Sequence, residues 1–517
     1  MPDAGGEGEI LALVLDQVRR FAAREIDSAA IDREAQIPPS VLRTAGELGL
    51  FGLTIPEEHG GMGLSMSAAT RVIIELAKVD RSVATSIGLH CGLGLRGLIE
   101  LGSPELQGQW LPRLATGEII ASFAATEPGA GSDLTAVRTT AVEQDGELTI
   151  DGEKAYVTNG AFAGLVTILA RTPGIGGARA HCLIAVPTGI PGVHIGPEEH
   201  KLGIRGSSTV TVTYENARVP MGNIIGEPGA GMKHAHRVLE WGRTLMSAGC
   251  VGTAKAALAA TLDHVVTRKQ FGKPIGHFAA SRAHVARMAG KVCAMESIVE
   301  HVARLEGLGE SIAIPSAAAK VFCSEGAFDV CDTAIQLHGA LGFIEETGIA
   351  RMLRDCRITR IFEGANDVLL VHTGAALLGG LAGVRRLHGD LSDGQAEGGQ
   401  AWERTERRLE EAVVAVKSRL GVGAVRHQLL LQRLARAHMA QLAASACMRG
   451  EQDGNGTDAL VVAYAVVELT SFADGQLDLL QGSEADAVRD AAVTDSLYSA
   501  QDGLEKGQPS KQPEARS

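Results

Sequence analysis

The sequence predicts an α+β protein in which a helical N-terminal domain, a central antiparallel β domain, a C-terminal four-helix bundle and an appended helical domain follow one another. Two observations carry this prediction. Long stretches in both halves of the chain repeat apolar residues at helical spacing, whereas the stretch between them consists of short β-branched runs separated by Gly, Pro, Asn and Asp. The 517 residues are also too many for a single core, so several packed domains are expected.

The N-terminal helical domain is predicted over residues 1–121. In "ILALVLDQVRRFAAREI", apolar side chains recur at Ile10, Val14, Val18 and Phe21, with charged residues between them. This spacing places the apolar residues on one face of an amphipathic helix. The domain should therefore be built from helices that bury one stripe each.

The β domain is predicted over residues 122–231. The runs "ELTIDGEKAYVTNG", "LVTILAR", "HCLIAVP" and "STVTVTYENARVP" are rich in β-branched residues and end at turn-forming residues. Such short, punctuated runs over about one hundred residues are typical of an antiparallel sheet.

Apolar residues at helical spacing resume over residues 232–381, the predicted four-helix bundle. A Gly/Asp/Gln-rich linker is expected at 382–400, and an appended helical domain at 401–502, where "RRLEEAVVAVKSRL" and "HQLLLQRLARAHMAQLAASACM" are amphipathic. The polar residues 503–517 are expected to be disordered.

Composition excludes several function classes. The net charge of −13 argues against a nucleic-acid partner and disfavours an anionic membrane surface. Apolar runs such as "LVVAYAVVELTSF" are too short and interrupted to span a bilayer. The 8 cysteines form no C-x-x-C pair, so neither zinc nor a redox disulfide is indicated.

The N-terminus "MPDAGGEGEI" is acidic and lacks the basic and apolar regions of a signal or transit peptide. We therefore expect a soluble cytoplasmic protein, or a mitochondrial-matrix protein if the chain is a processed form.

Two glycine- and hydroxyl-containing segments are candidate ligand sites. "FAATEPGAGSD" exposes backbone N–H groups that suit a phosphate, a carbonyl or a flavin edge, and Thr126 and Ser132 add hydroxyl donors. A purely structural loop is the alternative. In "KAYVTNG", Tyr156 and Thr158 lie on one side of a strand and suit a flat heterocycle, although an ordinary sheet face has the same pattern.

Two further segments follow in the helical half. "RKQFGKPIGHF" begins with Arg268 at a helix end, where an arginine either holds pyrophosphate or caps the helix. "QLHGALGF" is interrupted by glycines that would let a backbone approach a ligand.

The segment "ITRIFEGAND" places Glu363 between an aromatic residue and a glycine. An acid is favoured at a helix start in any case, which is the simplest interpretation. A catalytic base is the alternative.

In their order, these motifs resemble the acyl-CoA dehydrogenase family, flavin enzymes of fatty-acid and amino-acid oxidation. The resemblance covers residues 8–380, through "TEPGAGSD", "VTNG", "KLGIRGSST", "ARVPMGNIIGEPGAG", "RKQFGKPI", "QLHGALGF" and "IFEGAND". The helices beyond the linker look like the C-terminal extension of the very-long-chain branch.

The resemblance implies a role for each matching residue. Glu363 becomes the base that removes the α-proton of an acyl-CoA thioester, and Gly364 avoids crowding the flavin and the next turn. Arg243, with Glu240 one helical turn before it, matches the substrate-facing arginine. Ser132 also lies near the CoA pantetheine. The FAD contacts implied are Phe123, Ala125, Thr126, Gly131, Ser132, Tyr156, Val157, Thr158, Arg268, Phe271, Phe278, Gln336, Ala340, Ala365 and Asp367.

Three residues depart from the family pattern or stand out beside it. Ala340 and Ala365 stand where relatives often carry Gly and Thr, and Ala365 thereby loses a hydroxyl. Trp241 either alters the acyl cavity or packs beneath it, and packing is the expectation. The linker lacks the basic amphipathic stretch with which the very-long-chain branch sits on membranes, which argues against membrane association.

The resemblance implies an FAD-dependent enzyme that converts a long-chain fatty acyl-CoA to a trans-2-enoyl-CoA and passes electrons to an electron-transfer flavoprotein. A homodimer is expected. Branched or dicarboxylic acyl groups are alternative substrates, an oxygen-using acyl-CoA oxidase is an alternative activity, and an assembly scaffold of the same fold is an alternative of another class.

Overall fold

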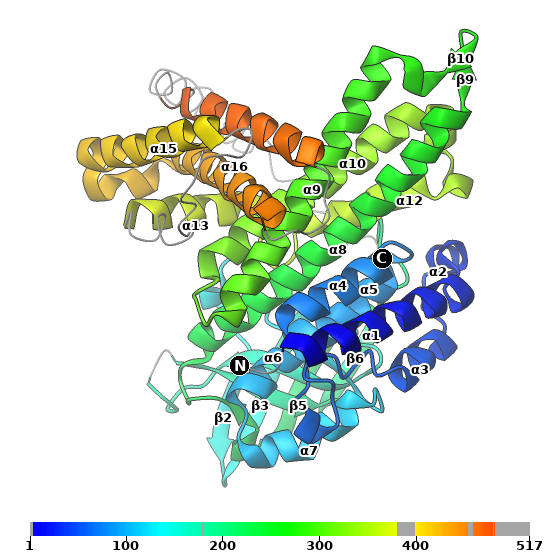
Figure 1. Cartoon of the computed structure of the whole chain (residues 1–517). Coiled ribbons are helices and arrows are strands. Elements are labelled where there is room, and N and C mark those ends of the chain that lie inside the picture. The colour runs from blue at the N-terminus through cyan, green and yellow to red at the C-terminus, as the bar shows by residue number, and fades with distance from the viewer. Residues whose placement is uncertain (1–3, 178–179, 380–398, 453–458, 479, 481–517) are drawn as a thin grey trace, which may run out of the picture.

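A computed structural model describes residues 4–177, 180–379, 399–452, 459–478 and 480. It confirms the α+β fold class, with a helical N-terminal domain, a central sheet and a helical C-terminal domain (Figure 1). The predicted tail at 503–517 and most of the predicted linker at 382–400 lie outside the described residues.

The N-terminal domain consists of short helices with defined starts. Its helices are α1 (Ala4–Glu25), α2 (Ser28–Glu34), α3 (Pro39–Glu47), α4 (Met66–Ala77), α5 (Arg81–Leu89), α6 (Leu95–Leu101) and α7 (Pro104–Ala115). The side chains of Asp27, Ser65, Asp80 and Ser103 accept backbone N–H groups at the starts of α2, α4, α5 and α7. These caps satisfy N–H groups that have no partner inside the helix.

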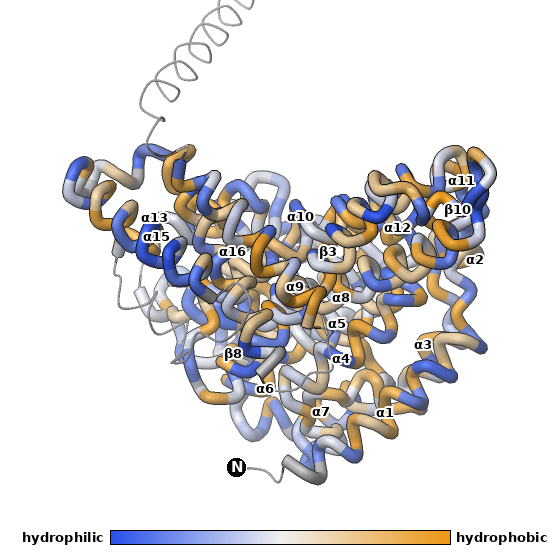
Figure 2. The backbone as a smooth tube through the Cα atoms, turned by 45° about the horizontal axis from the view of Figure 1, so that its top comes forward, coloured by the Kyte–Doolittle hydropathy of each residue, from blue (hydrophilic) through white to orange (hydrophobic). Residues whose placement is uncertain are grey.

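The predicted apolar stripe of α1 is largely confirmed. Val14, Val18 and Phe21 are buried, and the tube in Figure 2 alternates between hydrophilic and hydrophobic residues along α1. Ile10 is instead 41 % exposed, because Leu11 occupies the buried place at the start of the stripe. The stripe packs against α4, and α4 packs in turn against α5.

The central domain is an eight-stranded sheet in the order β6-β7-β3-β2-β4-β5-β8, with β1 paired to β4. The strands are β1 (Ile120–Ala124), β2 (Thr140–Gln144), β3 (Glu147–Thr158), β4 (Ala163–Arg171), β5 (His181–Pro187), β6 (Val193–Glu198), β7 (Thr209–Pro220) and β8 (Ile224–Ile225).

Most strand pairs are antiparallel, as predicted, but β4 is parallel to β1 and, at Thr140 and Arg171, to β2. The prediction of a purely antiparallel sheet is corrected at these two pairs. Parallel neighbours need a long connection, and the β2–β3 hairpin between β1 and β4 supplies it. The ends of β1 and β3 thereby come to lie beside the helical domains.

Three long helices form the axis of the C-terminal domain: α8 (Gly231–Thr267), α9 (Ala279–Gly307) and α10 (Ala313–His338). The short strands β9 (Lys269–Gln270) and β10 (Lys273–Pro274) form a hairpin between α8 and α9. The helices α11 (Ala340–Phe343), α12 (Ile349–Arg357) and α13 (Asn366–Gly379) complete the domain.

The appended module contains α15 (Gly399–Leu420), α16 (Gln428–Gln452) and a helix at Ala459–Asp478. It packs on the side of the C-terminal domain formed by α13 and α9, away from the N-terminal helices (Figure 1).

Two helices among the described residues are long and apolar enough to cross a membrane by length and composition alone, α8 and Ala459–Asp478. The apolar run "LVVAYAVVELTSF" belongs to the second helix. The run alone is too short to cross a bilayer, as expected, but the 20-residue helix that contains it is long enough. In α8, 67 % of the apolar window is buried inside the protein, as expected for a core helix.

Candidate active site

The candidate catalytic turn joins α12 to α13 and carries Glu363. The backbone is left-handed at Glu363 (φ 56°) and at Gly364 (φ 103°). A non-glycine residue in this conformation is strained and persists only where its surroundings hold it. Two cations do so: Arg243 Nε donates to the Glu363 carbonyl at 3.1 Å, and Lys320 Nζ donates to the Gly364 carbonyl at 2.8 Å.

The environment of Glu363 makes its carboxylate unusually basic. Its Oε2 atom is buried and has no hydrogen-bond partner among the described residues. Burial raises the pKa of Glu363 to about 7, although Lys320, Arg243 and Arg81 act in the opposite direction. A carboxylate with a pKa near neutrality is suited to take a proton from a weak carbon acid.

Two glycines make room for this arrangement. A Cβ on Gly242 of α8 would lie 2.9 Å from Glu363 Oε2 and 2.3 Å from Leu93 Cδ2, so α8 can pass the carboxylate only because no side chain stands there. Gly364 has a φ that favours glycine, and a Cβ there would lie 3.1 Å from Leu369 in the next helix. A side chain at position 364 would therefore crowd the next turn of this chain, as predicted.

A cavity of about 1000 Å³ opens in front of Glu363, between the three domains. It is lined by the end of β1 and the loop after it, by the end of β3, by α5 and α8, and by the catalytic turn. The predicted site residues that line it are Phe123, Ala125, Thr126, Gly131, Ser132, Tyr156, Thr158, Arg243, Glu363, Gly364 and Ala365. Segments far apart in sequence thus meet at one cavity.

The strand-side wall has the predicted aromatic and hydroxyl pair. Tyr156 is 65 % exposed, has a φ of 56°, and lies where the register between β3 and β7 shifts. Thr158, two residues further, lines the same cavity. Val157 between them is buried in the sheet core and points to the other side.

A buried ion pair anchors the glycine-rich loop. Glu127 accepts Lys154 Nζ at 2.8 Å and the backbone N–H groups of Arg138 and Thr139 at 2.7 and 3.0 Å. Lys154 also donates to the Ala125 carbonyl at 3.2 Å, and burial lowers its pKa to about 8. The pair fixes the loop against β3, which carries Tyr156 and Thr158.

Several predicted FAD contacts lie away from the cavity. Arg268, Phe271 and Phe278 lie beside the β9–β10 hairpin, and Gln336 and Ala340 are exposed where α10 ends. The structure brings these five together at one end of the molecule, where the rings of His264 and His338 stack at 4.3 Å. That these five residues contact FAD stays a prediction.

Asp367 and Glu240 also lie outside the cavity. Asp367 is exposed in the first turn of α13. Glu240 pairs with Arg237 at 3.1 Å and does not reach the cavity beside Arg243, because the two side chains diverge despite their i, i+3 spacing. Trp241 is buried under Arg96, with 3.8 Å from the guanidinium to the ring, so the expectation that it packs beneath the cavity is confirmed.

Sequence reasoning missed three polar residues around the catalytic turn. Lys320 is fully buried, and burial lowers its pKa to about 7. Asn366 is buried and bonded to Lys320 at 2.8 Å, and Arg81 lines the cavity while 5 % exposed. The sequence feature that points to Lys320 is a single lysine within "IPSAAAKVF", a run of small and apolar residues.

The lining of the cavity suits a flavin, the cofactor that the sequence motifs imply. The cavity's volume is at the upper end of ordinary ligand pockets. Phe123 and Tyr156 offer aromatic surface, Thr126, Ser132 and Thr158 offer hydroxyl groups, and the orphaned carboxylate lies across the cavity.

Family models match the three domains in order. The N-terminal, middle and C-terminal domains of acyl-CoA dehydrogenase match residues 9–118, 122–217 and 229–378.

Individual relatives agree with these matches. The human mitochondrial very long-chain specific acyl-CoA dehydrogenase is 34 % identical over 470 residues, covering 83 % of this chain and 72 % of its own length. The bovine protein of the same name is 37 % identical over 369 residues, so the aligned part spans 70 % of this chain and 56 % of that relative.

A solved acyl-CoA dehydrogenase from Bacillus anthracis, complexed with FAD, superposes with a TM-score of 0.81 at 27 % identity. It covers 93 % of this chain and 88 % of its own. That coverage extends past the three family domains into the appended helices.

Proposed function

Since this chain belongs to the acyl-CoA dehydrogenase family and is an FAD-dependent oxidoreductase, we propose that it oxidises the Cα–Cβ bond of long-chain fatty acyl-CoA to the trans-2-enoyl-CoA. Electrons then pass to an electron-transfer flavoprotein. The observation that carries the proposal is the buried, unpartnered carboxylate of Glu363 facing a cavity built from all three domains.

The chain's own residues supply proton transfer and positioning. Glu363 takes the α-proton, and its raised pKa makes it a stronger base than an exposed carboxylate. Arg243 and Lys320 hold the two carbonyls of the turn, so the carboxylate stays in place while the proton moves. The glycine-rich loop and β3 would hold FAD, which when bound accepts the β-hydride. The apolar walls exclude water from the reacting carbons.

Three observations support a dehydrogenase acting on long chains. The human relative, whose alignment covers 83 % of this chain and so extends past the three family domains, is named very long-chain specific, as is the bovine relative. The acyl side of the cavity is apolar, with Ile73, Leu89, Leu245 and Met246 among its lining residues. Retention of the base and of the loop and strand motifs favours catalysis over a scaffold role.

A second substrate class has one specific observation in its favour. Arg81 lines the same cavity, is 5 % exposed, and donates to the Met246 carbonyl at 3.1 Å. A buried guanidinium beside an acyl pocket would bind a carboxylate on the substrate's far end. Dicarboxylic acyl-CoA is therefore the alternative to a plain fatty chain.

Anaerobic titration with saturated acyl-CoAs of graded length tests the proposal. We expect the flavin absorbance to bleach, most completely with long chains, and the bleached enzyme to reoxidise on adding an electron-transfer flavoprotein. A second series of acyl-CoAs that carry a carboxylate at the far end of the chain separates the two substrate classes. If dicarboxylic acyl-CoA is the substrate, this series should have lower half-saturating concentrations than the plain fatty acyl-CoAs. Absence of bleaching with every compound would contradict the proposal, and peroxide formation in air would indicate the oxidase.

A further inference from the structure

The appended module packs directly on the helix that follows the catalytic turn. α16 lies along α13 and α9 (Figure 1). At the closest approach, a Cβ on Gly374 of α13 would lie 2.2 Å from the carbonyl oxygen of Leu431 on α16, so the two backbones touch only because residue 374 is glycine. The module therefore packs closely against α13, the helix that begins three residues after Glu363.

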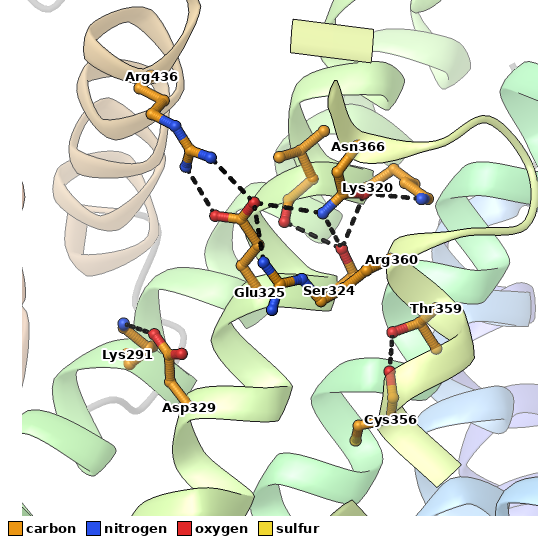
Figure 3. Close-up of polar contacts among 11 residues, drawn as sticks. Lys291, Lys320, Ser324, Glu325, Asp329, Cys356, Thr359, Arg360, Asn366 and Arg436 are labelled. Atoms are coloured by element: carbon orange, nitrogen blue, oxygen red, sulfur yellow. Dashed lines mark hydrogen bonds and ion pairs between the residues drawn. The ribbon is translucent and has the colours of Figure 1, made fainter. Parts of the chain in front are cut away.

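A chain of polar contacts runs from α16 to the catalytic turn (Figure 3). Arg436 on α16 donates to the two carboxylate oxygens of Glu325 on α10, at 2.8 and 3.2 Å. Glu325 also accepts Asn366 Nδ2 at 3.4 Å. Lys320 Nζ then donates both to Asn366 Oδ1 and to the Gly364 carbonyl, each at 2.8 Å. Four side chains thus connect the module to the residue after Glu363.

Arg436 is the contact that orients Glu325. Two donors of one guanidinium on two carboxylate oxygens fix the plane of the carboxylate as well as its position. The other nearby cation, Arg360, lies 3.9 Å from Glu325 Oε1 and makes one longer contact. Ser324 Oγ accepts the same Asn366 Nδ2 at 3.0 Å and lies 3.3 Å from Asn366 Oδ1.

The strained turn needs this support. Glu363 and Gly364 are both left-handed, and such a conformation persists only where neighbouring contacts determine it. Lys320 is one of the two cations on the turn's carbonyls, and Asn366 sets where its ammonium group lies. A network of this kind acts as a unit, so loss of one member is felt by the others.

We propose that Arg436 of the appended module is a positioning residue for the catalytic base, acting through Glu325, Asn366 and Lys320. This deepens the proposed function and rests on it. The module is then part of the catalytic apparatus, although none of its described residues lines the cavity. Acyl-CoA binding itself does not involve the network, so the effect belongs to the rate of proton abstraction and not to affinity.

The test compares Arg436→Gln with the wild-type full-length, flavin-loaded enzyme. Rapid mixing with a saturated acyl-CoA gives the limiting rate of flavin reduction and the half-saturating concentration. We expect the rate to fall about tenfold, within the range of couplings in one hydrogen-bond network, while the half-saturating concentration stays within about twofold. Amide hydrogen exchange over residues 361–369 should accelerate in the variant.

The matched control is Arg408→Gln. Arg408 pairs with Asp474 and Asp478 inside the appended module and, among the described residues, makes no polar contact with the catalytic turn, so this variant should leave both kinetic parameters and the exchange unchanged. Arg436→Lys, which keeps the charge but not the paired guanidinium donors, should restore only part of the rate. Glu325→Gln should reproduce the loss, and its combination with Arg436→Gln should add little.

An unchanged rate and exchange in Arg436→Gln would overturn the proposal, as would an equal loss in Arg408→Gln. These outcomes are distinguishable from failure of the proposed function. If acyl-CoA does not reduce the wild-type flavin, the substrate is wrong, and the exchange comparison alone still decides whether Arg436 positions the turn.

Discussion

At the residue scale, the site places a carboxylate where water does not stabilise its charge and surrounds it with cations that do not bond to it. Arg243 and Lys320 donate to backbone carbonyls of the turn rather than to the carboxylate of Glu363. The carboxylate therefore keeps its lone pairs free for a proton. A direct salt bridge would have lowered its pKa and its strength as a base.

The rate of flavin reduction should depend on pH through Glu363. The base must be ionised to act, and its pKa is about 7, so the limiting rate should rise as pH passes about 7 and level off above it. Lys320 favours the ionised form, so Lys320→Met should raise the midpoint by roughly one pH unit. Rapid-mixing rates from pH 6 to 9 measure both profiles. A midpoint that stays fixed or falls in Lys320→Met would contradict this electrostatic account.

At the element scale, the cavity depends on β3 being fixed to the glycine-rich loop. Lys154 is fully buried and its partner Glu127 nearly so, and the pair joins the two segments that line one wall of the cavity. Removing one member of a buried pair leaves an uncompensated charge.

Lys154→Met should therefore destabilise the protein by about 3 kcal/mol and lower its flavin content. The control is Lys291→Met, which removes the ion pair between Lys291 on α9 and Asp329 on α10 (Figure 3). These side chains are 37 % and 56 % exposed, so the loss should cost at most about 1 kcal/mol. Denaturant unfolding and the flavin-to-protein absorbance ratio report both effects. Equal losses of unfolding free energy in the two variants would show that burial does not make the Lys154–Glu127 pair more important for stability than the Lys291–Asp329 pair.

The element order was predictable because apolar period and turn residues are local signals, read within about ten residues. The parallel β1–β4 pair was not, since pairing across an intervening hairpin leaves no local pattern. The same holds at the site. Glu363, Tyr156 and Thr158 lie in motifs that the chain shares with a family, whereas Lys320 gains its role only when α10 packs beside the turn.

At the scale of the whole molecule, one end remains apolar and exposed. Phe271 is 92 % exposed and Phe343 81 %, and Leu341 and Ile344 are also exposed near the end formed by the β9–β10 hairpin and α11 (Figure 2). Five of the predicted FAD contacts that lie outside the cavity, Arg268, Phe271, Phe278, Gln336 and Ala340, are at this same end. An exposed apolar group of this kind marks an interface, which agrees with the expected homodimer.

The expected homodimer would bury Phe343 in its interface, so Phe343→Asp should shift such a dimer toward monomer and weaken flavin retention, because a charge would be buried there. Leu308→Asp, at an exposed position after α9, is the control and should leave the assembly unchanged. Sedimentation velocity on flavin-loaded protein measures both. A Phe343→Asp protein that sediments like the wild type would place the interface elsewhere.

In the proposed reaction, Glu363 removes a proton from the carbon beside a thioester, and bound FAD would accept the hydride. Rapid mixing of wild-type and Glu363→Gln enzyme with a saturated long-chain acyl-CoA tests it most directly. Both proteins should carry flavin and bind the ligand, and the limiting rate of bleaching should fall roughly a thousandfold in the variant. Bleaching of Glu363→Gln at the wild-type rate would contradict the account.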